Sequence, residues 1–319
     1  MEYRKLGNSG LKVSEIGLGG NNFGEDQRAN WGIDEQATAL VINHAMDLGI
    51  NFIDTADWYG NRGRSEEFIG RAVKGRRSQV IIATKFAFPT GEGPNDYGGS
   101  RYHIMRAIEA SLRRLDTDYV DLYQMHRPDP TTPIEETLRA LEDLIRDGKV
   151  RYIGCSNFAA WQLCEALWTS RVNNLASFIT VQPRYNLLDR TIERELVPCC
   201  QAHGIGVVPW GPLAGGFLTG KYLKGRETPA DSRFASSAMP IFSDLLGESG
   251  YDKVTRLQAF AEERGHSVGE LAIAWLLARP WLSSVIAGAK KTEQVAANVA
   301  AAEWKLTPEE VDQIDELSA

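Results

Sequence analysis

The sequence predicts an α/β fold: a closed (β/α)8 TIM barrel with an amino-terminal β-hairpin and an extra carboxyl-terminal helix. Eight short apolar segments each precede a segment with helical periodicity. Some of them, such as 80–83, are apolar throughout, as expected of strands that are buried on both faces. Because strands that alternate with helices pair in parallel through crossovers, eight such units favour a closed barrel. An open doubly wound sheet is the structural alternative.

The hairpin comes first, because residues 3–6 and 12–13 read as two short strands. After the first barrel strand, Asp34 can cap a helix of apolar residues at helical spacing, and Gly49 can end it. The eight barrel strands are expected at 16–18, 51–54, 80–85, 120–125, 150–155, 179–182, 206–209 and 284–286.

The later helices carry equally clear signals. A helix is expected after Thr132-Pro133, with an apolar stripe at 134, 138, 141 and 145, and Gly148 ends it. The tail 307–317 reads as the extra capped helix. Two long connections, 86–100 and 211–250, follow strands, so in a barrel they lie on the carboxyl face where active sites are built.

Composition limits the classes of function. The net charge of −7 argues against a polyanion such as nucleic acid as the main partner. No apolar segment approaches the ~20 residues that span a bilayer, and no secretory signal is recognised. The four cysteines lack a disulfide framework, which fits a reducing cytoplasm. With no linker or low-complexity segment, we expect one domain over residues 1–319, and the oligomeric state is not predicted.

Three local patterns do not complete a known site. The segment 17–22 approaches the dinucleotide fingerprint, but Asn22 replaces its third glycine. The segment 215–222 approaches a P-loop, but Tyr222 replaces the hydroxyl residue that would hold Mg²⁺. The histidines, at positions 44, 103, 126, 203 and 266, form no H-E-x-x-H motif. We therefore expect neither a Rossmann nor a P-loop enzyme, and no metal site is predicted.

Four polar residues stand at or just beyond the carboxyl ends of three successive expected strands. Asp54 ends the second strand, with Tyr59 in the loop after it. Lys85 ends the third strand and His126 follows the fourth. In a parallel barrel these positions converge on one rim. Each residue alone has an ordinary structural explanation, but their arrival at adjacent strand ends predicts a site.

The chemistry of these four residues is coherent. A buried lysine needs a carboxylate partner, which Asp54 can supply. The ammonium would lower the pKa of the Tyr59 phenol from about 10, so that Tyr59 could protonate a developing alkoxide. Neutral His126 could orient a carbonyl oxygen by a hydrogen bond. A polarised proton donor without a nucleophile suits carbonyl reduction, given a source of hydride.

Six segments, read in order along the chain, resemble the aldo-keto reductase family. They are 54–60 (DTADWYG), 83–85 (ATK), 124–129 (QMHRPD), 153–158 (IGCSNF), 181–186 (VQPRYN) and 212–221 (PLAGGFLTGK). The resemblance runs from about Tyr3 to the carboxyl end. It implies a (β/α)8 barrel that uses NAD(P)H, with Tyr59 as general acid, Lys85 and Asp54 tuning it, and His126 orienting the carbonyl.

The resemblance also implies the cofactor contacts. Ser156, Asn157 and Gln182 would hold the nicotinamide carboxamide, and Trp210 stands where the family usually has a stacking tyrosine. Gly20 and Asn21 would approach the nicotinamide ribose. The pyrophosphate would be lined by Gly211, Pro212, Leu213, Gly216 and Lys221, the adenosine half would be covered by Ser232 and Arg233, and the adenosine-phosphate segment would hold Gly288, Lys290, Gln294 and Asn298.

Gly288 and Gln294 depart from the family pattern. Many relatives have lysine and arginine there, which grip the 2′-phosphate of NADPH. Here Lys290, with Lys291 and Arg233, must supply that charge. The expected cofactor is NADPH, with use of NADH possible.

The carbonyl pocket is expected to include Trp31, Trp58 and Arg127, which would suit an aromatic or apolar substrate, and Arg127 could meet an anionic group. Two functions stay open. The first is an NADPH-preferring reductase of aldehydes or ketones. The second is a nicotinamide-nucleotide sensor or regulatory subunit, because the resemblance includes channel-associated members that keep the four residues.

Overall fold

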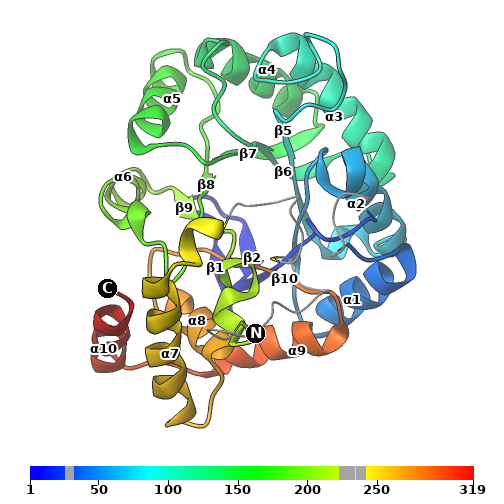
Figure 1. The fold of residues 1–319 in the computed structure, drawn as a ribbon. Helices are drawn as coiled ribbons and strands as arrows, with labels where there is room; N and C mark the ends of the chain where they lie inside the picture. Colours follow the sequence, from blue (N-terminus) through cyan, green and yellow to red (C-terminus); the bar gives the residue numbers. More distant parts are fainter. Residues whose placement is uncertain (26–31, 223–233, 235–241) are drawn as a thin grey trace.

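Eight parallel strands form one continuous sheet, as predicted. The computed structural model describes residues 1–25, 32–222, 234 and 242–319. The strands lie in the middle of the molecule with the helices around them (Figure 1), in the order β10-β3-β4-β5-β6-β7-β8-β9. Their bounds are β3 Ile16–Gly19, β4 Phe52–Asp54, β5 Ile81–Phe86, β6 Val120–Met125, β7 Val150–Ser156, β8 Thr180–Gln182, β9 Gly206–Val207 and β10 Val285–Gly288.

The two ends of the sheet meet and close the barrel. Isolated parallel bridges join Val207 to Leu282 and Trp210 to Ile286. The Ile286 N–H donates to the Pro209 carbonyl at 3.2 Å, and the Ser283 N–H donates to Val207 at 2.9 Å. These bonds satisfy backbone groups that an open sheet would leave at its edges. The open doubly wound alternative is therefore excluded.

The expected helices form, and their caps follow the sequence signals. The Asp34 side chain accepts from the Ala37 N–H, and Thr307 forms a capping box with Glu310 at the start of the carboxyl-terminal helix. The helices are α1 Glu35–Asp47, α2 Tyr59–Ala72, α3 Arg101–Leu115, α4 Ile134–Arg146, α5 Ala160–Val172, α6 Leu196–His203, α7 Glu248–Glu262, α8 Val268–Leu277, α9 Thr292–Ala300 and α10 Pro308–Ser318. No helix in the described part of the chain is long and apolar enough to cross a membrane.

The hairpin packs against the inner core of the barrel. Strands β1 (Tyr3–Lys5) and β2 (Lys12–Ser14) are antiparallel. Leu6 and Val13 are fully buried in one cluster with Phe52 and other inward-facing strand residues. Burying each such side chain contributes about 1.5–3 kcal/mol. The hairpin thus stabilises the barrel through a cluster that includes Phe52, two residues before Asp54.

Strand bounds shift by one or two residues from the prediction. Strand β9 ends at Val207 rather than at 209, because Pro209 has no N–H to continue a ladder. Strand β4 begins one residue later than expected, because the Asn51 N–H donates to the Ser14 hydroxyl oxygen at 3.1 Å and not to a strand carbonyl. Strand β5 also begins one residue later, at Ile81. Strands β3, β5, β7 and β10 extend one or two residues further toward the carboxyl face, where the candidate site lies.

Candidate active site

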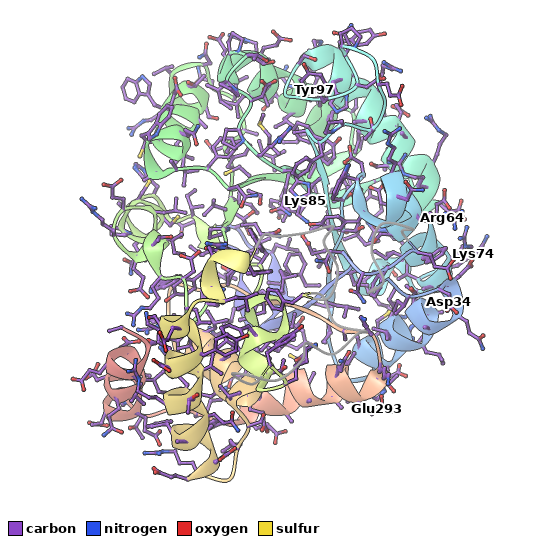
Figure 2. The ribbon with its side chains drawn as sticks, in the orientation of Figure 1. Asp34, Arg64, Lys74, Lys85, Tyr97 and Glu293 are labelled. Carbon is purple, nitrogen blue, oxygen red and sulfur yellow. The ribbon has the colours of Figure 1, made fainter. Side chains whose placement is uncertain are left out.

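The four strand-end residues converge on one rim, at the carboxyl ends of β4, β5 and β6. The Lys85 Nζ donates to Asp54 Oδ2 at 2.6 Å and to the Thr55 carbonyl at 2.8 Å. The Tyr59 hydroxyl lies 3.4 Å from Lys85 Nζ and 3.4 Å from His126 Nε2. The phenol oxygen is therefore flanked by a cation on one side and an imidazole on the other. Figure 2 shows Lys85 well inside the molecule.

The Asp54–Lys85 ion pair is buried. Lys85 is 0% exposed and Asp54 is 3% exposed. Burial disfavours the charged ammonium, but the Asp54 carboxylate and Tyr59 outweigh it, so the pKa of Lys85 is raised. The second carboxylate oxygen of Asp54 also has hydrogen-bond donors, because the amides of Gln182 and Gln124 donate to Oδ1 at 2.8 and 3.4 Å. The ammonium beside Tyr59 therefore keeps its charge at neutral pH.

His126 is held as a neutral imidazole. Burial first, and then the charges of Lys85 and Arg127, lower the pKa of His126 well below its usual 6.5. Its Nδ1 has no hydrogen-bond partner among the described residues. The Nε2 lies toward Tyr59, and the Phe88 ring packs edge-on at 4.4 Å between centroids. A neutral ring at this position can donate one hydrogen bond without adding a second positive charge.

An unusual turn follows Tyr59 and fixes its place. Residues Gly60, Asn61, Arg62 and Gly63 all have positive φ, between 60° and 109°. A Cβ at Gly60 would lie 2.4 Å from the Phe23 carbonyl oxygen, so only glycine fits there. The turn reverses the chain directly after Tyr59. The phenol is thus carried on a segment that packs closely between the loop after β3 and the rest of α2.

A cavity of about 400 Å³ extends from these residues across the carboxyl face. Most of the predicted site residues line it. These are Asn21, Asp54, Trp58, Tyr59, His126, Ser156, Asn157, Gln182, Trp210, Gly211, Pro212, Leu213, Gly216, Lys221, Gly288, Lys290 and Gln294.

Other predicted residues lie away from the cavity wall. Lys85 lies behind Asp54 and Tyr59, and Gly20 donates its N–H to the Asp54 carbonyl at 2.7 Å without lining the cavity. Asn298 is buried within α9, and the exposed Arg127 packs over the Phe88 ring at 4.6 Å. Trp31, Ser232 and Arg233 fall outside the described residues.

The cavity also has wall residues that the sequence did not single out for this role. Phe88 and Phe242 contribute aromatic surface, and Asn22 directs its Nδ2 to the Ala289 carbonyl at 2.7 Å. The other such residues are Gly19, Gly215, Thr219, Ile286 and Ala289. Phe88 could have been found from its place in the long loop after Lys85. Phe242 could have been found in the same way, because it lies in the second long connection, 211–250.

The residues at the two ends of the cavity fit a dinucleotide. At one end, Ser156, Asn157 and Gln182 present amide and hydroxyl groups beside the four strand-end residues. Their side chains are linked, because Asn157 donates to Ser156 Oγ at 3.1 Å and Trp210 Nε1 donates to Asn157 Oδ1 at 3.0 Å. Such groups match a carboxamide, which both donates and accepts.

At the other end, the amino terminus of α9 supplies Lys290, Lys291 and Gln294 to the cavity wall. A helix amino terminus with cations is suited to phosphate. Between the two ends, Lys221 lies against Gly216, where an added Cβ would be 3.0 Å from the lysine Cε. The bare backbone and the ammonium of this loop fit a pyrophosphate group.

Asp57, two residues before Tyr59, is buried at 1% exposure with no hydrogen-bond partner for either carboxylate oxygen among the described residues. Burial, and then the charge of Glu66, raise the pKa of Asp57 well above 3.8. Between pH 3.8 and the raised pKa of the folded state, Asp57 keeps its proton in the folded protein but has lost it in the unfolded chain. The free energy of unfolding therefore falls as the pH rises through this interval.

We expect Asp57→Asn to remove this pH dependence. Between the two pKa values of Asp57, the free energy of unfolding of the variant should exceed that of the wild type by an amount that grows by about 1.4 kcal/mol per pH unit. Urea unfolding from acid to neutral pH measures the difference. The exposed Asp118→Asn serves as control and should leave the wild-type slope in place. A constant difference between Asp57→Asn and wild type at all pH values would show that Asp57 has its ordinary pKa.

Comparison with known proteins places the chain in a family. Residues 15–319 match the Aldo/keto reductase family model. A probable voltage-gated potassium channel subunit beta from Oryza sativa subsp. japonica is 43% identical over 99% of this chain and 96% of its own. Versiconal hemiacetal acetate reductase from Aspergillus parasiticus is 37% identical, and L-glyceraldehyde 3-phosphate reductase from Escherichia coli O157:H7 is 35% identical. Both matches cover 99% of this chain. They cover 96% of the Aspergillus protein and 92% of the Escherichia protein. The chain belongs to the aldo/keto reductase family of NAD(P)H-dependent oxidoreductases.

Proposed function

We propose that this protein reduces aldehyde or ketone carbonyls to alcohols, with NADPH as the preferred cofactor and Tyr59 as the general acid. The observation that carries the proposal is the position of the Tyr59 hydroxyl. It lies 3.4 Å from both Lys85 Nζ and His126 Nε2, on the wall of a cavity that extends to Lys290. The proton donor and the residues that fit a dinucleotide therefore line one cavity.

Four residues of the chain would have separate roles in the reduction. A bound reduced nicotinamide supplies the hydride. His126, neutral at physiological pH, donates a hydrogen bond that orients the carbonyl oxygen toward Tyr59. Tyr59 gives its proton to that oxygen as negative charge develops on it. The Lys85 ammonium stabilises the phenolate that remains, and Asp54 holds the ammonium in place.

Side chains at both ends of the cavity would hold the cofactor. Ser156, Asn157 and Gln182 are proposed to hold the carboxamide, and Trp210 to stack on the nicotinamide ring. Lys290, at the start of α9, is proposed to meet the 2′-phosphate that distinguishes NADPH from NADH. Gly288 and Gln294 carry no charge, so Lys290 and its neighbours must provide it.

We expect Lys290→Ala to weaken NADPH by about 1.5–3 kcal/mol more than NADH, the scale of a hydrogen bond to a charged group. Titration of the protein's tryptophan fluorescence with each cofactor measures both affinities. Lys74→Ala is the matched control, since Figure 2 shows Lys74 on the outside of the molecule. Equal losses for the two cofactors in the Lys290 variant would mean that Lys290 does not contact the 2′-phosphate.

The substrate end of the cavity is aromatic. Trp58 and Phe88 pack with ring centroids 5.3 Å apart, and Phe88 also contacts His126. An aromatic or apolar carbonyl compound suits these walls. Arg127 lies over the outer face of Phe88, so we propose that it favours substrates with an anionic group that extends beyond the ring.

A second candidate function is a nucleotide-binding regulatory subunit, because relatives at 41–43% identity are named as potassium channel beta subunits. Steady-state assays separate the two. A reductase consumes NADPH in proportion to added aldehyde or ketone over a panel of aromatic, aliphatic and anionic carbonyls. A regulatory subunit binds NADPH tightly and consumes little of it with any member of the panel.

A further inference from the structure

Outside the active site, two cysteines and a histidine gather between helices α5 and α6. These helices are neighbours on the outside of the barrel (Figure 1). Cys164 belongs to α5, whereas Cys199 and His203 belong to α6 and are four residues apart, so they share one helix face. One ligand atom from each residue lies within 4.8 Å of the other two. The sequence did not predict this cluster, because its members come from separate segments with no motif spacing.

The dimensions of the cluster fit one metal ion. The Cys164 and Cys199 sulfurs are 3.2 Å apart. Two sulfurs bound to one zinc ion at about 2.3 Å each can be no more than about 4.6 Å apart, and a histidine nitrogen binds at about 2.0–2.1 Å. Small side-chain rotations are therefore enough to bring all three ligand atoms onto a tetrahedral ion. A disulfide needs a closer approach, to about 2.05 Å, and an oxidant as well.

The surroundings of the cluster allow an ion to enter. Cys164 and His203 are exposed and Cys199 is half-buried, so solvent reaches the site and a water molecule can complete four ligands. Cys200, the next residue, is buried at 1% exposure and stands outside the cluster.

We propose that Cys164, Cys199 and His203 form a binding site for a thiophilic divalent cation of the zinc class. Binding replaces two thiol protons by two metal–sulfur bonds and adds one metal–nitrogen bond, with no change of oxidation state. The ion would join α5 to α6, the helices that follow β7 and β8. Because those strands carry Ser156 and Gln182 to the active site, the ion would stabilise the framework of the cofactor site from outside. This site is independent of the proposed reductase activity.

The test uses the whole protein, fully reduced and freed of metal, with Co²⁺ alone as a spectroscopic probe and Zn²⁺ as competitor. We expect one Co²⁺ per chain with the strong visible absorption of a tetrahedral cobalt thiolate, displaced by Zn²⁺. Cys164→Ser and Cys199→Ser should each weaken binding by at least about 100-fold, more than the loss of an outer-shell partner. His203→Ala should weaken it by at least about 10-fold. Cys200→Ala, the matched control, should bind as the wild type does.

A measurement on the wild type alone covers the case in which a variant fails to fold. Zn²⁺ should protect Cys164 and Cys199 from alkylation, read by mass spectrometry, and should raise the midpoint of thermal unfolding as its concentration rises. Absence of cobalt–thiolate absorption, or alkylation at equal rates with and without Zn²⁺, would overturn the proposal. Cobalt binding that is unchanged in His203→Ala would also overturn it, because the ion would then rest on the thiols alone.

Discussion

Replacement of Tyr59 by phenylalanine should abolish most of the reductase activity while cofactor binding persists. The change removes one hydroxyl, the group that lies 3.4 Å from Lys85 Nζ, and leaves the ring in place. General acid catalysis by a positioned side chain contributes about 10²–10⁴-fold, so kcat should fall by that factor. Stopped-flow measurement of NADPH oxidation gives the rate, and fluorescence titration gives the affinity of the cofactor.

Tyr102→Phe is the control for this experiment. Tyr102 is 59% exposed on α3 and does not line the cavity, so its hydroxyl should not matter to turnover. If Tyr59→Phe turns over at the wild-type rate, the proton comes from another group and the assignment of Tyr59 is wrong. A loss of NADPH affinity equal to the loss of rate would show instead that the variant has disturbed the cavity.

The second large effect is expected from the buried ion pair. Lys85→Met removes the cation and leaves the Asp54 carboxylate buried with only the amides of Gln124 and Gln182 as donors. Leaving one member of a buried pair uncompensated costs about 3–5 kcal/mol. The free energy of unfolding in urea should fall by this amount, and reductase activity should fall as well, because the ammonium no longer stabilises the Tyr59 phenolate.

A double-mutant cycle tests the physical reason. Lys85→Met combined with Asp54→Asn removes both charges, so the double variant should be more stable than Lys85→Met alone and still inactive. Arg76, which is half-buried and paired with Asp47 at 3.4 Å on the outside of the barrel, gives a control outside the site. Arg76→Met should cost at most about 1 kcal/mol. Equal stability of the single and double Lys85 variants would show that the buried charge of Asp54 is not the cause.

The fold could be predicted from the sequence because the hydrophobic periodicity and the capping residues indicate the same strands and helices. Alternating strands and helices give the barrel, and Asp34 and Thr307 mark helix starts that the structure confirms. The four strand-end residues could be placed together for the same reason: the carboxyl ends of parallel strands share a rim. The least predictable strand bounds lay where a side chain takes a backbone hydrogen bond, as the Ser14 hydroxyl does with the Asn51 N–H, or where proline ends the strand.

Contacts between distant segments could not be predicted in this way. Gln182 appears in a motif, but only the folded chain brings its amide to Asp54, 128 residues earlier. Phe242 lies in a loop that the sequence assigns to the carboxyl face, but only the folded chain brings its ring to 5.8 Å from the Trp210 ring, between centroids. Cys164 and Cys199 come from different helices, and their approach depends on how α5 packs against α6. Periodicity predicts which face of an element is buried, but it does not identify the residue on the facing element.

The central claim is that Tyr59 protonates a carbonyl while the same cavity holds a reduced nicotinamide. A single-turnover experiment tests it most directly: the NADPH complex is mixed with each member of a panel of aldehydes and ketones, and nicotinamide absorbance is followed in time. Our proposal predicts rapid oxidation of one equivalent of NADPH by aromatic or apolar carbonyls, with formation of the alcohol. Tight NADPH binding with no oxidation by any member of the panel would contradict it and favour the regulatory-subunit alternative.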